Sequence, residues 1–398
     1  MAQDAAASEG VHISERALSV PWSGIRQMFE LAARVPDAIS LAIGQPDFPT
    51  PPHIVEAGQR ALAEGYTRYA PALGLLELRE AIARKVWREN GLQVDPRTEV
   101  IVTAGAVEGL LLALMATLDP GDEVLMPDPG YTNYEGLIRV VSGVPVHVPA
   151  REEEGFLMRP EEVEGAITER TRLLILNSPA NPTGAVMPRP YLEEMAEIAQ
   201  RHNLVVISDE AYEKFIYDGL EHVSIAALPG MKERTISVYT LSKTYAMTGW
   251  RIGFNVGPSE LISHMHRMQE VVVSCVATFV QRAAIAALDG PQEGVAQRVA
   301  EYDVRRKYIV DALNRIPGVR CVEPKGAFYV FPNVSALGRP SLEVAMALLE
   351  HSRVICVPGT AFGPRGEGYL RISYAAPLEV LEEGARRIRE GVERLSRG

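Results

Sequence analysis

The sequence predicts an α/β protein: a large domain with a mainly parallel seven-stranded sheet covered by helices, and a smaller α+β domain. Its length of 398 residues leaves room for two or three domains. Seven short runs rich in β-branched residues lie between residues 99 and 256, and helical stretches separate most of them. This alternation is typical of a parallel sheet with helices on both faces.

The chain before the sheet supplies a lead-in segment and two helices. Segment 1–45 has no strong apolar core of its own, and we expect it to pack against the smaller domain. A proline-rich loop at 46–52 connects it to the body of the protein. Residues 53–64 and 74–90 are predicted as amphipathic helices, because their apolar residues recur at helical spacing.

The large sheet is predicted from residue 99 onward. Its strands are expected at 99–103, 123–126, 144–148, 172–176, 204–208, 235–238 and 251–256. Helices are expected between strands, for example at 106–118 and 190–202. Ligands of such sheets bind beyond the carboxyl ends of the strands. The residues that follow each strand are therefore the candidates for a functional site.

A second unit is predicted after the sheet. It begins with one long helix at 292–316. Shorter strands and helices follow at 327–331, 341–350, 353–357, 369–374 and 377–395. We therefore divide the chain into an N-terminal segment (1–45), a large domain (46–290) and a small domain (291–398).

Charge and apolar pattern argue against several partners. The net charge is −11 and no basic stripe exists, so nucleic acid is not expected. No apolar run approaches the roughly 20 residues that cross a membrane. Residues 1–10 also lack the basic start and apolar run of a signal peptide. We expect a cytoplasmic protein.

Metal and disulfide chemistry are not expected either. Cys275, Cys321 and Cys356 lie far apart and form no CxxC pair, which favours thiols in a reducing compartment. His264 and His266 have the spacing of a solvated helix face, and the chain has no HExxH motif. We therefore predict no metal site.

Four segments follow predicted strands and are rich in polar or small residues: 103–108, 177–184, 208–212 and 239–251. Small residues in the first let backbone N–H groups at a helix start approach an anion such as phosphate. Prolines and a glycine in the second fix a rigid loop that holds Asn181 as a donor. Taken alone, each of these two segments is equally a plain structural turn.

The third and fourth segments carry charged groups. Asp209 ends a buried strand, where a carboxylate is costly unless a pyridinium, a metal or an arginine pairs with it. Lys243 is one of six lysines, has hydroxyl-bearing neighbours and precedes Arg251 by eight residues. Lysine amines form Schiff bases and arginine binds phosphate bidentately. The pattern favours an aldehyde cofactor with a phosphate tail, although a loop lysine by itself is usually a solvated charge.

Together the four segments resemble the aspartate aminotransferase family, the class I/II aminotransferases of pyridoxal phosphate (PLP) fold type I. The resemblance covers nearly the whole chain. It begins at ISLAIGQPDF (39–48), includes YAPALG (69–74), and ends with PGTAFG (358–363) and YLRISY (369–374). The details look closest to the branch of aromatic and broad-specificity aminotransferases.

The resemblance implies how the cofactor pyridoxal 5'-phosphate would be held. Lys243 matches the Schiff-base lysine, which is also the base that moves the substrate proton. Asp209 matches the acid that pairs with the pyridine nitrogen, which makes the ring an electron sink. Tyr212 and Asn181 match residues that hydrogen-bond the phenolic oxygen, and Tyr131 matches the aromatic residue stacked on the ring.

The resemblance also implies a phosphate site, a substrate site and a homodimer with shared active sites. The phosphate cradle corresponds to Gly105, Ala106, Val107, Thr240, Ser242 and Arg251. Tyr69 matches a tyrosine that reaches the phosphate from the neighbouring subunit. Arg371 matches the arginine that binds the substrate α-carboxylate, helped by Gly44 and Asn181.

The implied reaction is a ping-pong transfer of the amino group of an α-amino acid to a 2-oxo acid such as 2-oxoglutarate. At the position of Thr240, members of the family commonly have glycine or serine. Threonine retains the hydroxyl that serine would supply. Val107 stands where some aspartate-selective members carry a lysine, so aromatic or broad specificity is favoured. Arg26 could overturn this expected specificity, because the lead-in segment could place its guanidinium over the site. Trp22 is expected to pack rather than to touch substrate.

Three alternatives stay open at this point. The chain could be an aspartate aminotransferase, or a PLP enzyme of another reaction type, such as a β-lyase or a carbon–carbon-forming enzyme, because a fold does not determine a reaction. A PLP-sensing regulator is disfavoured, since the chain before Ile39 is too short and too acidic for a DNA-binding domain.

Overall fold

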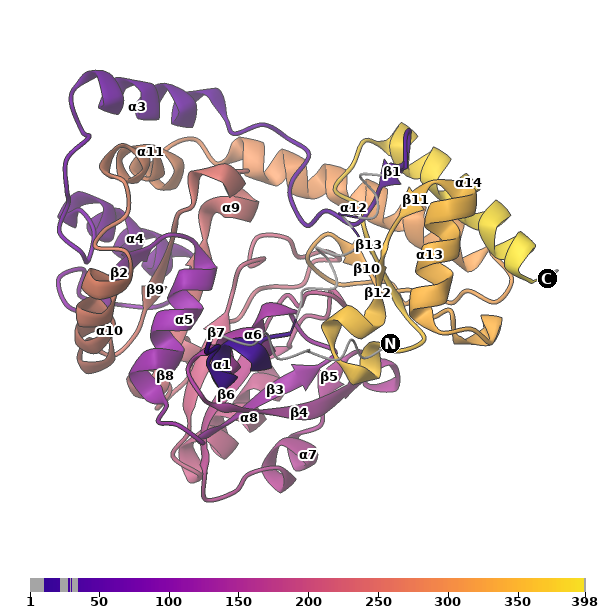
Figure 1. The fold of residues 1–398 in the computed structure, drawn as a ribbon. Coiled ribbons are helices and arrows are strands. Elements are labelled where there is room, and N and C mark those ends of the chain that lie inside the picture. Colours follow the sequence, from indigo (N-terminus) through magenta and orange to yellow (C-terminus); the bar gives the residue numbers. More distant parts are fainter. Residues whose placement is uncertain (1–10, 22–27, 29, 31–34, 397–398) are drawn as a thin grey trace.

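The structure is a computed structural model that describes residues 11–21, 28, 30 and 35–396. Figure 1 shows a larger body in purple to salmon and a smaller one in orange and yellow, with helix α12 running between them. The main sheet has the strand order β2-β9-β8-β7-β6-β3-β4-β5. Its strands are β2 (Val100–Thr103), β3 (Glu123–Asp128), β4 (Val144–Arg151), β5 (Leu157–Met158), β6 (Thr171–Asn177), β7 (Val205–Asp209), β8 (Thr235–Thr240) and β9 (Gly253–Val256).

This sheet confirms the predicted fold class. All seven expected strands form, and the two-residue strand β5 adds to the edge beside β4. Strands β4, β3, β6, β7 and β8 pair in parallel. Strand β9 runs antiparallel to both β8 and β2, because its connection from β8 stays at one end of the sheet and the chain turns straight back.

Helices cover both faces of the sheet, which explains why its strands are apolar throughout. Helices α5 (Ala106–Thr117), α6 (Asn133–Val140) and α10 (Ser259–Val272) share one buried core with the central strands. The other face is covered by α3 (Pro52–Ala63), α4 (Leu76–Asn90), α8 (Arg189–Arg201) and α11 (Thr278–Asp289). The short helices are α7 (Pro160–Gly165) and α9 (Leu241–Thr244).

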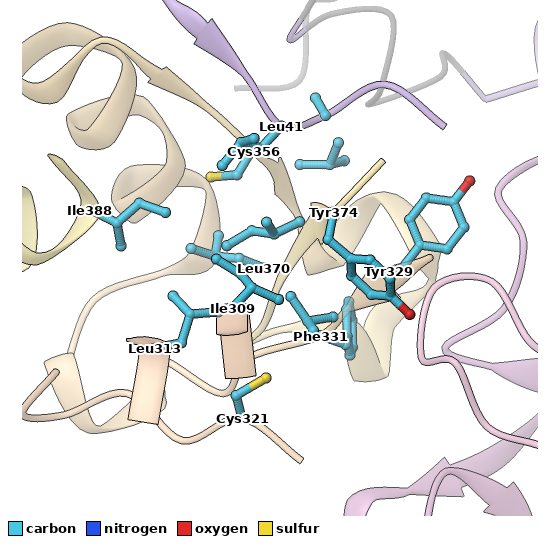
Figure 2. Close-up of a cluster of buried hydrophobic side chains, with 14 of the residues drawn as sticks. Leu41, Ile309, Leu313, Cys321, Tyr329, Phe331, Cys356, Leu370, Tyr374 and Ile388 are labelled. Atoms are coloured by element: carbon cyan, nitrogen blue, oxygen red, sulfur yellow. The ribbon is translucent and has the colours of Figure 1, made fainter. Parts of the chain in front are cut away.

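The small domain has its own sheet and core. Its elements are α12 (Glu293–Asn314), β10 (Tyr329–Val330), α13 (Ser341–Ser352), β11 (Val354–Ile355), β12 (Val357–Pro358), β13 (Leu370–Ser373) and α14 (Leu378–Leu395). Strand β13 lies between β10 and β12 and is antiparallel to both. Figure 2 shows Ile309 and Leu313 of α12 in one apolar cluster with Leu370 and Ile388.

The lead-in segment touches both bodies. Strand β1 (Ile39–Ser40) pairs in parallel with β11, and Met28 and Leu41 are buried in the small-domain core. Helix α1 (Glu15–Ser19) contacts α6 of the large domain. We propose domain boundaries at 45/46 and 290/291, with residues 39–42 as the part of the lead-in that completes the small domain. Within the described residues, every helix is too short or too polar to cross a bilayer.

Candidate active site

A cavity of about 350 Å³ lies beyond the carboxyl ends of β6, β7 and β8, where the large domain meets the small one. It is lined by Ile43, Gly44, Gln45, Ala106, Val107, Leu110, Tyr131, Asn177, Asn181, Asp209, Ala211, Tyr212, Thr240, Ser242, Lys243, Thr248, Arg251, Tyr329 and Arg371. All site residues predicted from the sequence line it except Gly105 and Tyr69. The fold therefore brings together residues that lie far apart in the sequence.

Lys243 differs from every other lysine in the chain. It lies on α9, the single turn that follows β8, and its Nζ donates to the carbonyl oxygen of Gly44 at 2.6 Å. Each of the other five lysines forms an ion pair with a carboxylate: Lys85 with Glu213, Lys214 with Glu89, Lys232 with Glu99, Lys307 with Asp303 and Lys325 with Asp218. The amine of Lys243 is thus hydrogen-bonded to a neutral carbonyl oxygen, whereas the other lysines pair with carboxylates.

The surroundings of Lys243 make its amine a better nucleophile. Burial, followed by the nearby charges of Arg371 and Arg251, lowers the pKa of Lys243 to about 8. At neutral pH this raises the fraction of neutral amine on the order of a hundredfold over an ordinary lysine. A neutral lysine amine in a cavity is the group that attacks a carbonyl carbon.

Asp209 supplies the buried carboxylate at the end of β7, where it is only 4% exposed. The hydroxyl of Tyr134 donates to its Oδ2 at 2.7 Å, and the backbone N–H of Ala211 donates to its Oδ1 at 3.2 Å. Burial outweighs these hydrogen bonds and raises the pKa of Asp209 to about 6. A cation placed in the cavity would stabilise the ionised form.

An anion site lies at the start of α5. Gly105 precedes the helix with a φ of 88°, and a Cβ there would lie 2.5 Å from Nη2 of Arg251. Among the described residues Arg251 donates to the carbonyl oxygens of Thr248 and Ala104, at 2.9 and 3.3 Å. The first N–H groups of a helix have no partner within the helix. This end of the cavity suits phosphate.

A second anion site surrounds Arg371 on β13, which is 1% exposed. Its Nη1 donates to Oδ1 of Asn181 at 3.1 Å and its Nη2 to the carbonyl oxygen of Ala42 at 2.6 Å, whereas its Nε has no hydrogen-bond partner among the residues described. In the part of the chain that the structure describes, no carboxylate forms an ion pair with it. A buried cation without a counterion is costly, so the site favours a carboxylate ligand.

Two tyrosines of the site were not predicted from the sequence. Tyr134 holds Asp209, and Tyr329 lies with its hydroxyl 2.8 Å from that of Tyr212. Tyr134 lies in α6, three residues after Tyr131, and the two rings meet edge to face at 5.4 Å between centroids. That spacing is the signal that could have identified Tyr134, whereas Tyr329 is hidden in an apolar strand.

Tyr69 is 91% exposed and does not contribute to the cavity of its own chain. Two further residues named from the sequence, Trp22 and Arg26, lie outside the described residues.

One group of possible metal ligands lies elsewhere in the described residues. Glu210, Glu213 and His222 bring ligand atoms within 4.8 Å of one another. Both carboxylates already have partners, because Lys85 pairs with Glu213 and the His222 ring contacts Glu210 at 2.7 Å. Glu210 is buried and the other two are partly buried, so the arrangement is that of a hydrogen-bonded cluster between the domain's own side chains.

The fold and this cavity place a buried amine and a buried carboxylate between two sites that suit anions. Residues 36–388 match the family described as Aminotransferase class I and II, and the chain belongs to this family. Its members use pyridoxal phosphate. The protein is therefore an aminotransferase, which moves an amino group from an amino acid to a 2-oxo acid.

The similar proteins include enzymes named for aspartate and enzymes named for aromatic amino acids. The chain is 47% identical to an aspartate aminotransferase of Pyrococcus abyssi, over 94% of this chain and 97% of the relative. It is 44% identical to aromatic-amino-acid aminotransferase 2 of Thermococcus litoralis, with the same coverage. The crystal structure of an aromatic aminotransferase from Pyrococcus horikoshii superimposes with a TM-score of 0.88 at 47% identity, covering 93% of this chain and 99% of that one.

Proposed function

We propose that this aminotransferase binds pyridoxal phosphate through Lys243 and accepts aromatic or other apolar amino acids, with a 2-oxo acid as acceptor. The observation that carries the proposal is the unpaired amine of Lys243, placed between a buried carboxylate and two anion sites. The residues fit the cofactor at each of its functional groups. When bound, its ring supplies the electron sink that stabilises negative charge at the substrate Cα.

The residues at one end of the cavity would bind and polarise pyridoxal phosphate. Asp209 would pair with the ring nitrogen and keep it protonated, while Tyr212 and Asn181 would donate to the phenolic oxygen. Tyr131 would contact the ring. The phosphate is held by the backbone of Gly105, Ala106 and Val107, by the hydroxyls of Thr240 and Ser242, and by Arg251.

The residues at the substrate end orient the reacting bond. Arg371 clamps the α-carboxylate bidentately, with Gly44 and Asn181 beside it. The amine of Lys243 would accept the proton from the substrate Cα and return it. A pKa near 8 suits this exchange, because proton transfer is most efficient when the pKa lies near the working pH.

The residues that line the cavity support a preference for substrates with apolar side chains. Among the described residues the cations that line it are Lys243, Arg251 and Arg371, and each already has a role. Val107, where a lysine would serve a dicarboxylate, is apolar, and so are Ile43 and Leu110. A buried carboxylate without a cation is costly. The aspartate-named relatives favour the competing assignment, which the following measurement decides.

We expect phenylalanine, tyrosine and leucine to convert the bound cofactor to its amine form at least as fast as aspartate. The physical reason is the missing second cation, since desolvating an unpaired carboxylate costs about 2 kcal/mol or more, roughly thirtyfold in rate. The measurement is stopped-flow absorbance of the half-reaction with phenylalanine, tyrosine, leucine, alanine, aspartate and glutamate in turn.

Two outcomes would redirect the assignment. A preference for aspartate above about a hundredfold over every apolar substrate would contradict the proposal, and Arg26→Ala would then show whether that arginine supplies the second cation. Release of ammonia without formation of the amine cofactor would instead indicate a β-lyase.

We also propose a homodimer with shared active sites. Tyr69 exposes a large aromatic ring, and Val271, which is 87% exposed, begins an exposed apolar run at the end of α10. Thr278 at the start of α11 donates to the carbonyl oxygen of Arg68, which places the Tyr69 loop against α11. Such a surface suits the interface of a two-fold dimer, in which Tyr69 reaches the phosphate of the partner.

Mixing Tyr69→Phe chains with Lys243→Ala chains is expected to restore roughly a quarter of wild-type activity, because half of the dimers are mixed and each has one intact site of two. Tyr69→Phe alone should weaken pyridoxal phosphate binding about tenfold, since it removes a charge-assisted hydrogen bond. Activity is therefore assayed at limiting cofactor, with dimer exchange followed by native mass spectrometry.

The matched control places both substitutions in one chain. Mixed dimers of Tyr69→Phe with the double variant Tyr69→Phe/Lys243→Ala contain no intact site and should recover nothing. If mixed dimers form in the first experiment and activity stays at the level of the parents, the sites are not shared.

A further inference from the structure

Tyr329 occupies a junction between the small-domain core and the cavity. It lies on β10, and Figure 2 shows its ring at the edge of the apolar cluster with its hydroxyl directed away from those side chains. The hydroxyl lies 2.8 Å from that of Tyr212, which belongs to the large domain. The two rings meet edge to face at 5.7 Å between centroids.

The ring of Tyr329 also supports the carboxylate clamp. The guanidinium carbon of Arg371 lies over this ring, 4.5 Å from its centroid, and over the ring of Phe362 at 4.9 Å. Aromatic faces attract a cation, and a guanidinium stacked on them keeps its edges free for hydrogen bonds. Since no described carboxylate pairs with Arg371, these rings supply much of the favourable contact that the buried cation has.

The Tyr329 hydroxyl also lies close to the backbone of Gly44. A Cβ at Gly44 would lie 2.4 Å from the Tyr329 hydroxyl oxygen, so only glycine fits there without a shift. The carbonyl oxygen of the same glycine accepts the hydrogen bond from Lys243. The hydroxyl is therefore confined within the site and has little freedom to turn away from Tyr212.

The number of protons on the two hydroxyls determines which oxygen donates the hydrogen bond between them. Each tyrosine has one hydroxyl proton and can accept from another donor. If Tyr212 donates its proton into the cavity, the bond between the two oxygens must be donated by Tyr329. A donor behind Tyr212 makes it a stronger donor in turn, because linked hydrogen bonds polarise one another.

We infer that Tyr329 is a positioning residue that couples the two ends of the site: its ring seats Arg371 for the substrate carboxylate, and its hydroxyl aims the proton of Tyr212 at the cofactor. This inference rests on the proposed function, specifically on pyridoxal phosphate in the cavity. The two halves of the role can be separated, because Tyr329→Phe removes only the hydroxyl, whereas Tyr329→Leu removes the ring as well.

The hydroxyl half is tested by titrating the absorbance of the bound cofactor against pH. A hydrogen bond to the phenolic oxygen stabilises its deprotonated form, so weakening that bond raises the midpoint. Tyr212→Phe should raise it most, and Tyr329→Phe should raise it by about half a unit. In the Tyr212→Phe background, Tyr329→Phe should add no further shift, because its effect passes through Tyr212.

The ring half is tested by equilibrium binding of 3-phenylpropanoate and succinate, unreactive acids that need the carboxylate clamp. Tyr329→Phe should change neither dissociation constant by more than about twofold, while Tyr329→Leu should weaken both about tenfold. Tyr374→Phe is the matched control. It removes a buried hydroxyl from the same core, where it bonds to Tyr217 and to the carbonyl oxygen of Ala327, outside the cavity. It should move neither readout.

The outcomes separate failure of the inference from failure of the proposed function. A wild-type protein that shows no cofactor absorbance would refute the function itself. If the wild-type protein titrates and Tyr329→Phe leaves the midpoint unchanged, or shifts it equally in the Tyr212→Phe background, the hydroxyl role is wrong. If Tyr329→Leu binds both acids as tightly as the wild type does, the ring role is wrong.

Discussion

Asp209→Asn is expected to lower turnover by at least about a hundredfold while the protein still binds pyridoxal phosphate. The buried carboxylate of Asp209 is held by Tyr134 and the Ala211 N–H, and it faces the cavity. A carboxylate about 3 Å from a cationic ring nitrogen in a partly buried site interacts by several kcal/mol. Asparagine keeps the shape and loses the charge, so the ring nitrogen loses its proton and the ring accepts electrons poorly.

The measurement is the rate of the half-reaction together with the dissociation constant of the cofactor. Asp128→Asn is the matched control, because Asp128 is also a buried carboxylate at the end of a parallel strand of the same sheet, β3, but does not line the cavity. Burial raises the pKa of Asp128, which makes the neutral amide a mild replacement, and its turnover should stay within a few-fold of the wild type. Near-normal turnover of Asp209→Asn would refute the assigned role.

Lys243→Ala is expected to abolish turnover, by about ten-thousandfold or more, because it removes both the amine that holds the cofactor and the group that moves the Cα proton. The cavity offers no substitute among the described residues, since the other cations that line it are arginines, which do not deprotonate. Noncovalent binding of the cofactor should persist, because the phosphate and ring contacts remain.

The control for this variant is Lys307→Ala. Lys307 is an exposed lysine that pairs with Asp303 on α12, and its loss should leave turnover unchanged. In the wild type, the rate at which the cofactor-free protein forms its covalent link should rise with pH up to about 8, because only the neutral amine attacks the aldehyde. Turnover by Lys243→Ala within tenfold of the wild type would place the chemistry on another residue.

The strands and long helices of the large domain could be predicted because their signal is local. Runs of β-branched residues and helical spacing depend on neighbours in the sequence, and the predicted strand at 204–208 closely matches β7. Strand direction could not be read in this way, because periodicity carries no direction. The antiparallel course of β9 depends on the path of its connection to β8, which the composition of β9 does not reveal.

Site residues could be predicted where a charged residue or a glycine stands out in the sequence. They could not be predicted where their role depends on contacts between distant parts of the chain. Asp209 and Lys243 stand out because charged residues after buried strands are costly. Tyr329 looks like any core aromatic in the sequence, and its importance arises only when β10 meets Tyr212 and Arg371 from distant parts of the chain. Tyr134 was missed for the same reason, since its partner lies 75 residues away.

The central claim is that Lys243 is the residue that holds the cofactor, and the most direct measurement is reduction of the loaded protein with borohydride followed by peptide mapping. Reduction fixes the cofactor to whichever amine it is attached to, and the chain has only six lysines to distinguish. We expect the label on Lys243 alone, in the segment that also contains Arg251. A label on any of the five lysines that are paired with carboxylates, with none on Lys243, would contradict the account.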